Sequence, residues 1–310
     1  MQITFFDALK KIYKRMLIIF SLCLIANGCS KNVDIDTAKE LARKGEASKA
    51  FEILMPFALQ GNSDAQFCIG NMYSVGHGVK QNSAEALKWY LRSARQNNGD
   101  AQFYLSIMYL DGKGIEKNEC EGLNWLQKAA DNGVANAQIN LSACYYSGRL
   151  VKQDYKQALF WLQKAIDKND AEAIARMSAI YTEGKAVEKN GQKALEYLQK
   201  AAEMNHPEAQ YMMWKMNIHM DSLKDGTPWL IASAKNGNIR SQLVLGIIYT
   251  AIDKKDKANK WFVSASTQKK LPPGTIEKAE EYAESIKKNN RLELCKLAIS
   301  YVERILPQDK

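Results

Sequence analysis

Residues 64–99 read DAQFCIGNMYSVGHGVKQNSAEALKWYLRSARQNNG, and the fold can be inferred from this segment. Its first part, residues 64–73, repeats apolar side chains at the spacing of one helix face. Gly76 ends that helix, since glycine accepts the left-handed backbone of a helix C-terminus. Asn82 or Ser83 can cap the next helix by accepting hydrogen bonds from its first N–H groups. A second apolar stripe follows, so the stretch predicts two helices joined by a turn.

The same pattern recurs along the chain with a period of 36 residues. A fixed period of this length is typical of stacked helical units, because a single unit cannot bury its own apolar face. The aromatic series then continues at a shorter spacing of 32, to Trp229 and Trp261. The recurring residues are Tyr73, Tyr109, Tyr145 and Tyr181; Gly76, Gly112, Gly148 and Gly184; and Trp89, Trp125, Trp161 and Tyr197.

The pattern A-x-F-x-I-G-x-x-Y-x-x-G-x-G-V, followed by A-x-x-W-x-x-x-x-A, resembles the Sel-one-like repeat family, a relative of the tetratricopeptide repeats. The resemblance implies an all-α fold, a right-handed α/α solenoid of helix-turn-helix repeats. It covers residues 37–268, from a degenerate first hairpin through about six repeats. Pro272-Pro273-Gly274 interrupts the array, and residues 269–310 are expected to form capping helices, because a solenoid end needs a polar outer face.

The N-terminus predicts an export signal. Residues 1–28 combine a basic start with the apolar run Met16–Ala26, which is too short for a membrane-spanning helix. The run ends at Ile25-Ala26-Asn27-Gly28-Cys29, which resembles the lipobox of bacterial lipoproteins. The resemblance implies that Cys29 is lipidated, residues 29–36 form a tether, and the protein lies in the bacterial envelope. Ser30 implies sorting to the outer membrane, facing the periplasm. The alternative is a plain secretory signal in which Cys29 is incidental.

Cysteine and charge patterns limit the remaining site classes. Export would place the mature cysteines in an oxidising compartment, where disulfides persist. Cys120 and Cys144 flank the turn near Asn132-Gly133 at similar distances, so a disulfide between them is one hypothesis and core packing of Cys144 the other. The absence of a CxxC motif or a Cys/His cluster argues against a structural zinc site. The chain carries a net charge of +9, but its lysines are spread without interleaved aromatics, which argues against nucleic-acid binding.

No catalytic constellation stands out in the sequence. The three histidines, His77, His206 and His219, are scattered along the array, whereas catalysis needs groups that converge. None of the common hydrolase, zinc-protease or nucleotide-binding motifs is present. We therefore expect a protein that is not an enzyme, has no catalytic or metal-binding residues and needs no cofactor.

Apolar side chains on the first helices of the second and third repeats predict a partner-binding surface. Ile107, Leu110 and Tyr146 have no role in the repeat pattern, and a contiguous exposed apolar patch usually marks an interface. Core packing is an equally good explanation for Phe103 and Ile139, and coverage by another segment is an alternative for the whole patch. The five predicted partner-binding residues are Phe103, Ile107, Leu110, Ile139 and Tyr146.

The resemblance also suggests the kind of partner. Lipid-anchored Sel-one-like proteins include periplasmic immunity proteins against secreted phospholipase toxins and scaffolds for exopolysaccharide export. The resemblance therefore implies a protein partner, with a toxin preferred over a component of an envelope assembly or signalling system. An envelope hydrolase is the third reading, which the missing catalytic residues disfavour.

Overall fold

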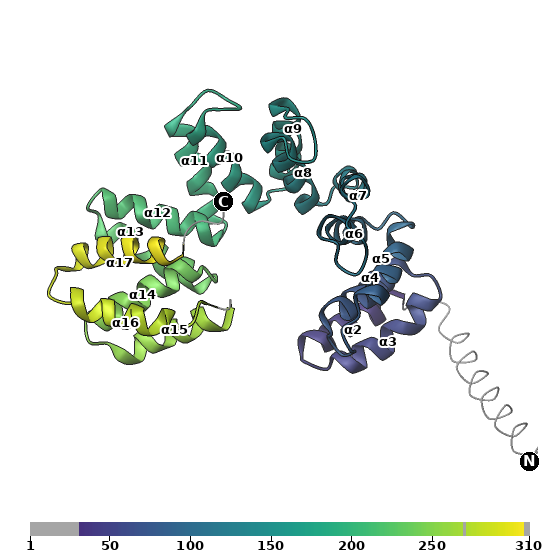
Figure 1. The fold of residues 1–310 in the computed structure, drawn as a ribbon, viewed down its shortest axis with the longest axis horizontal. Helices are drawn as coiled ribbons and strands as arrows, with labels where there is room; N and C mark the ends of the chain where they lie inside the picture. The colour runs from purple at the N-terminus through teal and green to yellow at the C-terminus, as the bar shows by residue number, and fades with distance from the viewer. Residues whose placement is uncertain (1–30, 269–270, 307–310) are drawn as a thin grey trace, which may run out of the picture. The chain divides into compact units, whose positions relative to one another are not determined.

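The computed structural model describes residues 31–268 and 271–306, which form sixteen helices and, within these ranges, no strand. The chain divides into two compact units between Ala137 and Gln138. Consecutive helices pack as antiparallel pairs in the order of the sequence (Figure 1). The predicted all-α solenoid of helix-turn-helix repeats is thus confirmed.

The first unit contains the helices that precede Ala137. The strongest packing in it joins α4 to α5 and α6 to α7, the two helices of one repeat in each case. The helix α2 already begins at Lys31, so the expected tether at 29–36 is helical from residue 31 onward. The signal segment 1–28 and Cys29 lie outside the described residues. The helices are α2 Lys31–Arg43, α3 Ala47–Leu59, α4 Ser63–Val75, α5 Ser83–Ala94, α6 Gly99–Asp111 and α7 Glu119–Asp131.

The helix α8, Ala135–Ser147, contains the division between the units. The second unit continues with nine further helices, in which α10 pairs with α11, α12 with α13 and α14 with α15. They are α9 Tyr155–Ile166, α10 Ala171–Glu183, α11 Gly191–Glu203, α12 Pro207–His219, α13 Leu223–Lys235, α14 Ile239–Ala251, α15 Lys255–Gln268, α16 Thr275–Ile286 and α17 Arg291–Ile305.

Side-chain caps explain where the helices of the repeats begin. Asn62 accepts a hydrogen bond from the Ala65 N–H at 2.8 Å, and Asn82 accepts from Ala84 and Glu85. These bonds satisfy backbone donors that have no partner inside the helix. The same cap recurs in later repeats at Asn98, Asn118, Asp154, Asp170 and Asn190.

The turns within the repeats depend on two positions with positive φ. Gly76, Gly112, Gly148 and Gly184 all end a first helix in the left-handed conformation. Two residues later, Gly114 has φ +79° and lies so close to Ser83 that a Cβ atom would approach the Ser83 Cβ to 2.5 Å. In the third repeat the corresponding residue is Leu150, which also has a positive φ of 69°. A leucine in this conformation is strained, because its Cβ crowds the following carbonyl.

Buried glutamines link four of the helix pairs to the helix that precedes them. Gln66, Gln102, Gln210 and Gln242 each donate a hydrogen bond from Nε2 to the backbone oxygen of the alanine eight residues earlier. That oxygen lies near the C-terminal end of the preceding helix, where carbonyl groups lack intrahelical partners. The glutamine of the recurring Ala-Gln pair therefore has a structural role, since it links neighbouring helix pairs. Its recurrence does not indicate a ligand-binding site.

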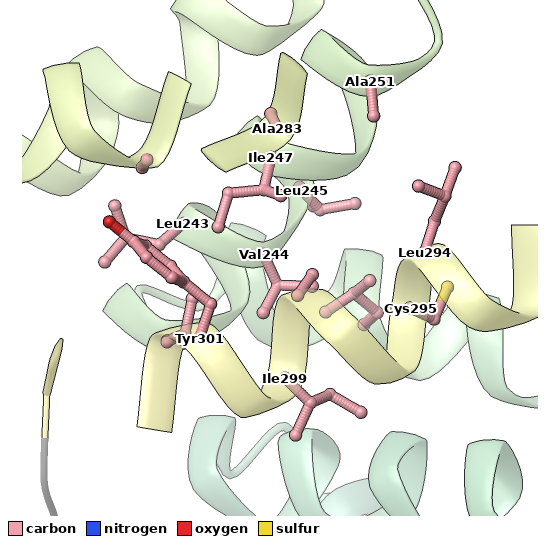
Figure 2. Packing of buried hydrophobic residues seen from close by; sticks show 14 of the residues in the cluster. Leu243, Val244, Leu245, Ile247, Ala251, Ala283, Leu294, Cys295, Ile299 and Tyr301 are labelled. Carbon is pink, nitrogen blue, oxygen red and sulfur yellow. The ribbon is translucent and has the colours of Figure 1, made fainter. Parts of the chain in front are cut away.

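The C-terminal part of the second unit is organised around α14. Leu243, Val244 and Leu245 are consecutive and therefore point to different sides of this helix, yet each is at most 4% exposed. A helix that is apolar on all sides must be covered on all sides. α14 is covered by α13, α15, α16 and α17, and Figure 2 shows Leu294, Cys295 and Ile299 of α17 packing in the same core.

Candidate partner-binding surface

The predicted residues of the first unit are only half-exposed. Phe103, Ile107 and Leu110 of α6 are all partly buried. Leu110 packs inside its own repeat, because its side chain lies against Gly122 of α7, where a Cβ atom would approach the Leu110 Cγ to 2.6 Å. Phe103 lies against Tyr104, with ring centroids 5.9 Å apart. Leu110 is therefore explained by packing within the hairpin, whereas Ile107 and Phe103 keep some free surface.

The two predicted residues of the second unit differ from each other. Ile139 is only 2% exposed, so its assignment to an exposed surface was wrong and it is a core residue. Tyr146 is half-buried against Tyr155, with ring centroids 5.3 Å apart, and its hydroxyl donates to Glu183 Oε2 at 2.7 Å. Burial and this hydrogen bond raise the pKa of the Tyr146 hydroxyl. Three of the five residues belong to the first unit and two to the second.

An aromatic cluster on the first unit includes one of the predicted residues. Tyr104 is 41% exposed and stacks on Tyr90, with ring centroids 5.7 Å apart and an interplanar angle of 17°. Phe67 lies 5.6 Å from the ring of Tyr104. Tyr90 itself is buried and donates its hydroxyl hydrogen bond to Asn71 at 2.6 Å. Tyr104 is therefore the exposed ring of this cluster, whereas Phe67 and Phe103 are half-buried.

The second unit contains a more open apolar groove, here called the α9–α11 groove, with a volume of about 600 Å³. One face of α9 forms one wall, and α10, the turn after it and α11 form the other. Phe160 of α9 is 49% exposed, which is unusual for a large aromatic side chain. The lining residues are Lys156, Leu159, Phe160, Gln163, Lys164, Asp167, Met177, Tyr181, Val187 and Tyr197.

Lysine ammonium groups lie over aromatic rings that line the α9–α11 groove. Tyr181 stacks on Tyr197 with ring centroids 5.7 Å apart and an interplanar angle of 15°. The Lys164 ammonium lies 4.6 Å from the centre of the Phe160 ring, and the Lys193 ammonium lies 5.4 Å from the Tyr181 ring. Ammonium groups at these distances are attracted to the ring face. The groove therefore offers apolar surface together with positive charge.

Phe160 escaped the sequence analysis, although the sequence contains a signal for it. The residue just before the repeat aromatic is Lys88 in the first repeat, Asn124 in the second and Glu196 in the fourth. All three are exposed and polar, as expected for the solvent face of a helix. Only the third repeat has an aromatic residue there. The predicted partner-binding residues all lie on the first helices of the repeats, whereas Phe160 lies on a second helix.

The polar cluster of His206, Glu172 and Arg176 has a structural explanation. His206 caps α12 by accepting from the Ala209 N–H through Nδ1, and its Nε2 lies 2.8 Å from Glu172 Oε2. Asn98 makes the equivalent contact with Asp64 at 2.9 Å in an earlier repeat. The hydrogen bond with His206, followed by the contact with Arg176, lowers the pKa of the Glu172 carboxyl to about 2.

The described residues show neither a metal site nor a membrane-spanning helix, and their cysteines are free. These residues contain no group of three or more His, Cys, Asp or Glu side chains that could hold a metal ion. They also include no helix long and apolar enough to cross a membrane. Cys120 is exposed on α7 and Cys144 half-buried in α8, and both are free thiols in the structure, as are Cys68 and Cys295. The hypothetical bond between Cys120 and Cys144 is therefore not formed here.

Comparison with protein-family models finds four consecutive Sel1 repeats, at residues 63–98, 99–134, 135–170 and 171–206. The chain is a Sel1 repeat protein. Each matched segment contains one pair of helices with a glycine-ended turn, as described above. A search of curated proteins found no match.

Solved structures of Sel1 repeat proteins are similar to this one. A Sel1 repeat protein from Oxalobacter formigenes is 29% identical with a TM-score of 0.65, over 76% of this chain and 100% of that chain. A protective antigen of uropathogenic Escherichia coli with an SLR fold is 22% identical with a TM-score of 0.57, over 86% of this chain and 64% of that one. An immunity protein from Pseudomonas aeruginosa is 17% identical with a TM-score of 0.48, over 75% of this chain and 83% of that one.

Proposed function

We propose that this Sel1 repeat protein binds another protein and that the α9–α11 groove is its principal contact surface. Sel1 repeats serve as scaffolds for protein interaction rather than as enzymes, which is the coarse function that the family supports. The observation that carries the choice of surface is the exposure of Phe160 beside Lys164 in an apolar groove. Exposed aromatic side chains in a concave apolar surface are the residues that most often dominate protein interfaces.

The experiment compares two aspartate variants at equivalent positions. Phe160→Asp places a charge in the groove, whereas Asn124→Asp places the same charge at the corresponding exposed position of the second repeat. Immobilised full-length proteins are incubated with an envelope extract, and captured proteins are quantified by mass spectrometry. We expect the wild type and Asn124→Asp to capture similar amounts of a specific partner. Phe160→Asp should capture at least tenfold less of it. Equal retention by all three proteins would show that the groove is not the contact surface.

The finer proposal is that the partner is a secreted toxin of the phospholipase type, which the protein neutralises as a periplasmic immunity protein. It rests on the resemblance of the repeats to families with such members. The alternative is a scaffold or regulator of an envelope assembly, polysaccharide-export or signalling system. The two proposals differ in a growth assay: expression of this protein should protect cells from a lipase toxin encoded beside it, whereas a scaffold gives no protection.

We also propose that Cys29 carries a lipid that anchors the protein to the envelope, which radiolabelling with palmitate can test. Firm attachment needs more than one acyl chain, and a lipobox cysteine receives two or more. Cys29→Ala is expected to take up no palmitate label and to leave the outer-membrane fraction, either as a soluble protein or as an uncleaved precursor. Unchanged labelling and fractionation of that variant would contradict the anchor.

A further inference from the structure

The α9–α11 groove differs from the same place in the other repeats by its charge. Lys156 occupies the position of Ala84, Cys120 and Gln192 in the other three repeats. The position of Lys193 is held by an acidic residue in the first two repeats, at Glu85 and Glu121, and by Gln157 in the third. Lys156 therefore adds a positive charge to the lining of the groove, and Lys193 adds one beside it, against the Tyr181 ring of the opposite wall.

Lys164, the other lysine that lines the groove, has a structural role as well. Lys164 lies 4.7 Å from the centre of the Trp161 ring. The equivalent residues, Arg92 and Lys128, lie over Trp89 and Trp125 at 4.6 and 4.2 Å. A basic residue over the repeat tryptophan is thus part of the scaffold. Lys156 and Lys193 have no such counterpart in the other repeats, so the scaffold does not explain their positive charge.

The groove contains little negative charge to neutralise these lysines. Asp167 is the one acidic residue among those that line it, and its carboxylate accepts a hydrogen bond from Gln163 at 2.7 Å. Lys156 is exposed, and the structure shows Lys193 against the Tyr181 ring rather than against a carboxylate. Positive charge beside an apolar, low-dielectric surface attracts an anionic group more strongly than charge in open water does.

The dimensions of the groove suit a short peptide segment. The lining face of α9 runs from Lys156 to Asp167, which spans about 17 Å at the helical rise per residue. An extended chain of about five residues has the same length. Its apolar side chains would contact Phe160, Tyr181 and Tyr197, and its carboxylates would reach the lysines.

We infer that the α9–α11 groove binds an acidic peptide segment of the partner, in which Asp or Glu residues accompany apolar side chains. This inference rests on the proposed function and specifies the chemistry of its partner. Lys156 and Lys193 are the residues that select for negative charge, and Phe160 supplies the apolar contact.

The test uses two fluorescein-labelled octapeptide libraries and the full-length protein. In the acidic library, Asp or Glu alternates with Leu, Val or Phe; in the neutral library, Asn or Gln replaces each acid. Binding is measured by fluorescence anisotropy at low and high salt. We expect the acidic library to bind at least tenfold more tightly than the neutral one, with the difference reduced by salt, because salt screens the charges.

Charge-reversal variants separate the groove from the net charge of the protein. Lys156→Glu with Lys193→Glu is expected to weaken binding of the acidic library at least tenfold. Lys224→Glu with Lys235→Glu makes the same change in net charge at exposed positions on α13 and should have little effect. Equal weakening by the two double variants would overturn the inference, since it would reflect net charge alone.

Other outcomes distinguish the inference from the proposed function. Equal affinity for the neutral library, or displacement of the acidic peptides by a single-stranded oligonucleotide, would overturn the acidic specificity. If Phe160→Asp still abolished capture of the protein partner, the proposed contact surface would stand despite that failure. If Phe160→Asp left partner capture unchanged, the proposed function of the groove would itself be wrong, regardless of how the peptide libraries bind.

Discussion

The four Sel1 repeats and the C-terminal helices bury their apolar residues in different ways. In the repeats, residues 63–206, the same positions are filled in each copy, so the scaffold is revealed by recurrence. The part that follows has short turns, and its core surrounds α14, a helix buried on all sides. Recurrence in the repeats therefore distinguishes the residues that the scaffold requires from those that it does not explain. Phe160 and Leu150 stand out in the repeats because three other copies show what the scaffold requires.

The largest expected effect tests the central position of α14. Ile247→Ala should lower the free energy of unfolding by about 3 kcal/mol, because it removes a completely buried side chain from a packed core. Val263→Ala on α15 is the control, since Val263 is 60% exposed and its loss should cost less than about 0.5 kcal/mol. Urea denaturation followed by circular dichroism measures both. Similar losses in the two variants would contradict the proposed core.

A second prediction concerns the turn between α6 and α7. Gly114→Ala should lower the free energy of unfolding by about 2 kcal/mol, since the alanine would need a left-handed backbone and its Cβ would meet Ser83. The control is Gly191→Ala, where no atom lies within 4 Å of the added Cβ and φ is not positive. Thermal unfolding of both variants gives the comparison. An unchanged melting temperature for Gly114→Ala would show that the turn adjusts without cost.

A third prediction uses the lowered pKa of Glu172. Because the folded-state pKa is about 2 and the ordinary value is 4.5, the contact stabilises the fold above about pH 4.5. That stabilisation disappears as the pH falls from 4.5 towards 2. Glu172→Gln should therefore cost about 1 kcal/mol at neutral pH, the scale of a partly exposed ion pair, and almost nothing near pH 2. A difference between the two proteins that stays constant over this pH range would contradict the assignment.

The smallest expected effect has the opposite sign. Leu150→Gly should raise the free energy of unfolding by about 0.5 kcal/mol, because glycine relieves the left-handed strain but makes the unfolded chain more flexible. Ala186 holds the same position in the fourth repeat without a positive φ, so Ala186→Gly should be destabilising. The two variants are compared by thermal unfolding. If both changes lowered the melting temperature, strain at Leu150 would be excluded.

The sequence predicted most of the repeat architecture, because glycine turns, caps and aromatic positions recur at a constant spacing. The shift in period from 36 to 32 also follows from the structure, since the turn 184–190 of the fourth repeat is replaced by the shorter turn 220–222 after α12. The packing of α17 against α12 and α14 could not be predicted, because those contacts join segments distant in sequence that have no internal copy.

The candidate surface was predicted less well than the fold. Ile139 is buried and Leu110 packs against Gly122, because helix rotation within a repeat decides which apolar residues face solvent, and periodicity alone left that rotation open. The charge and exposure of the α9–α11 groove depend on side chains from three helices. Their proximity became visible only in the structure, although the exceptional Phe160 was already readable by comparing the repeats.

Site-specific photocrosslinking tests most directly whether the partner binds at the α9–α11 groove. A photoreactive phenylalanine analogue replaces Phe160 in one protein and Asn124 in another, and each is irradiated in cells that contain the natural partner. We expect a crosslinked adduct with one partner protein from position 160 and none from position 124. An adduct from position 124 without one from position 160 would contradict the assignment of partner binding to the α9–α11 groove.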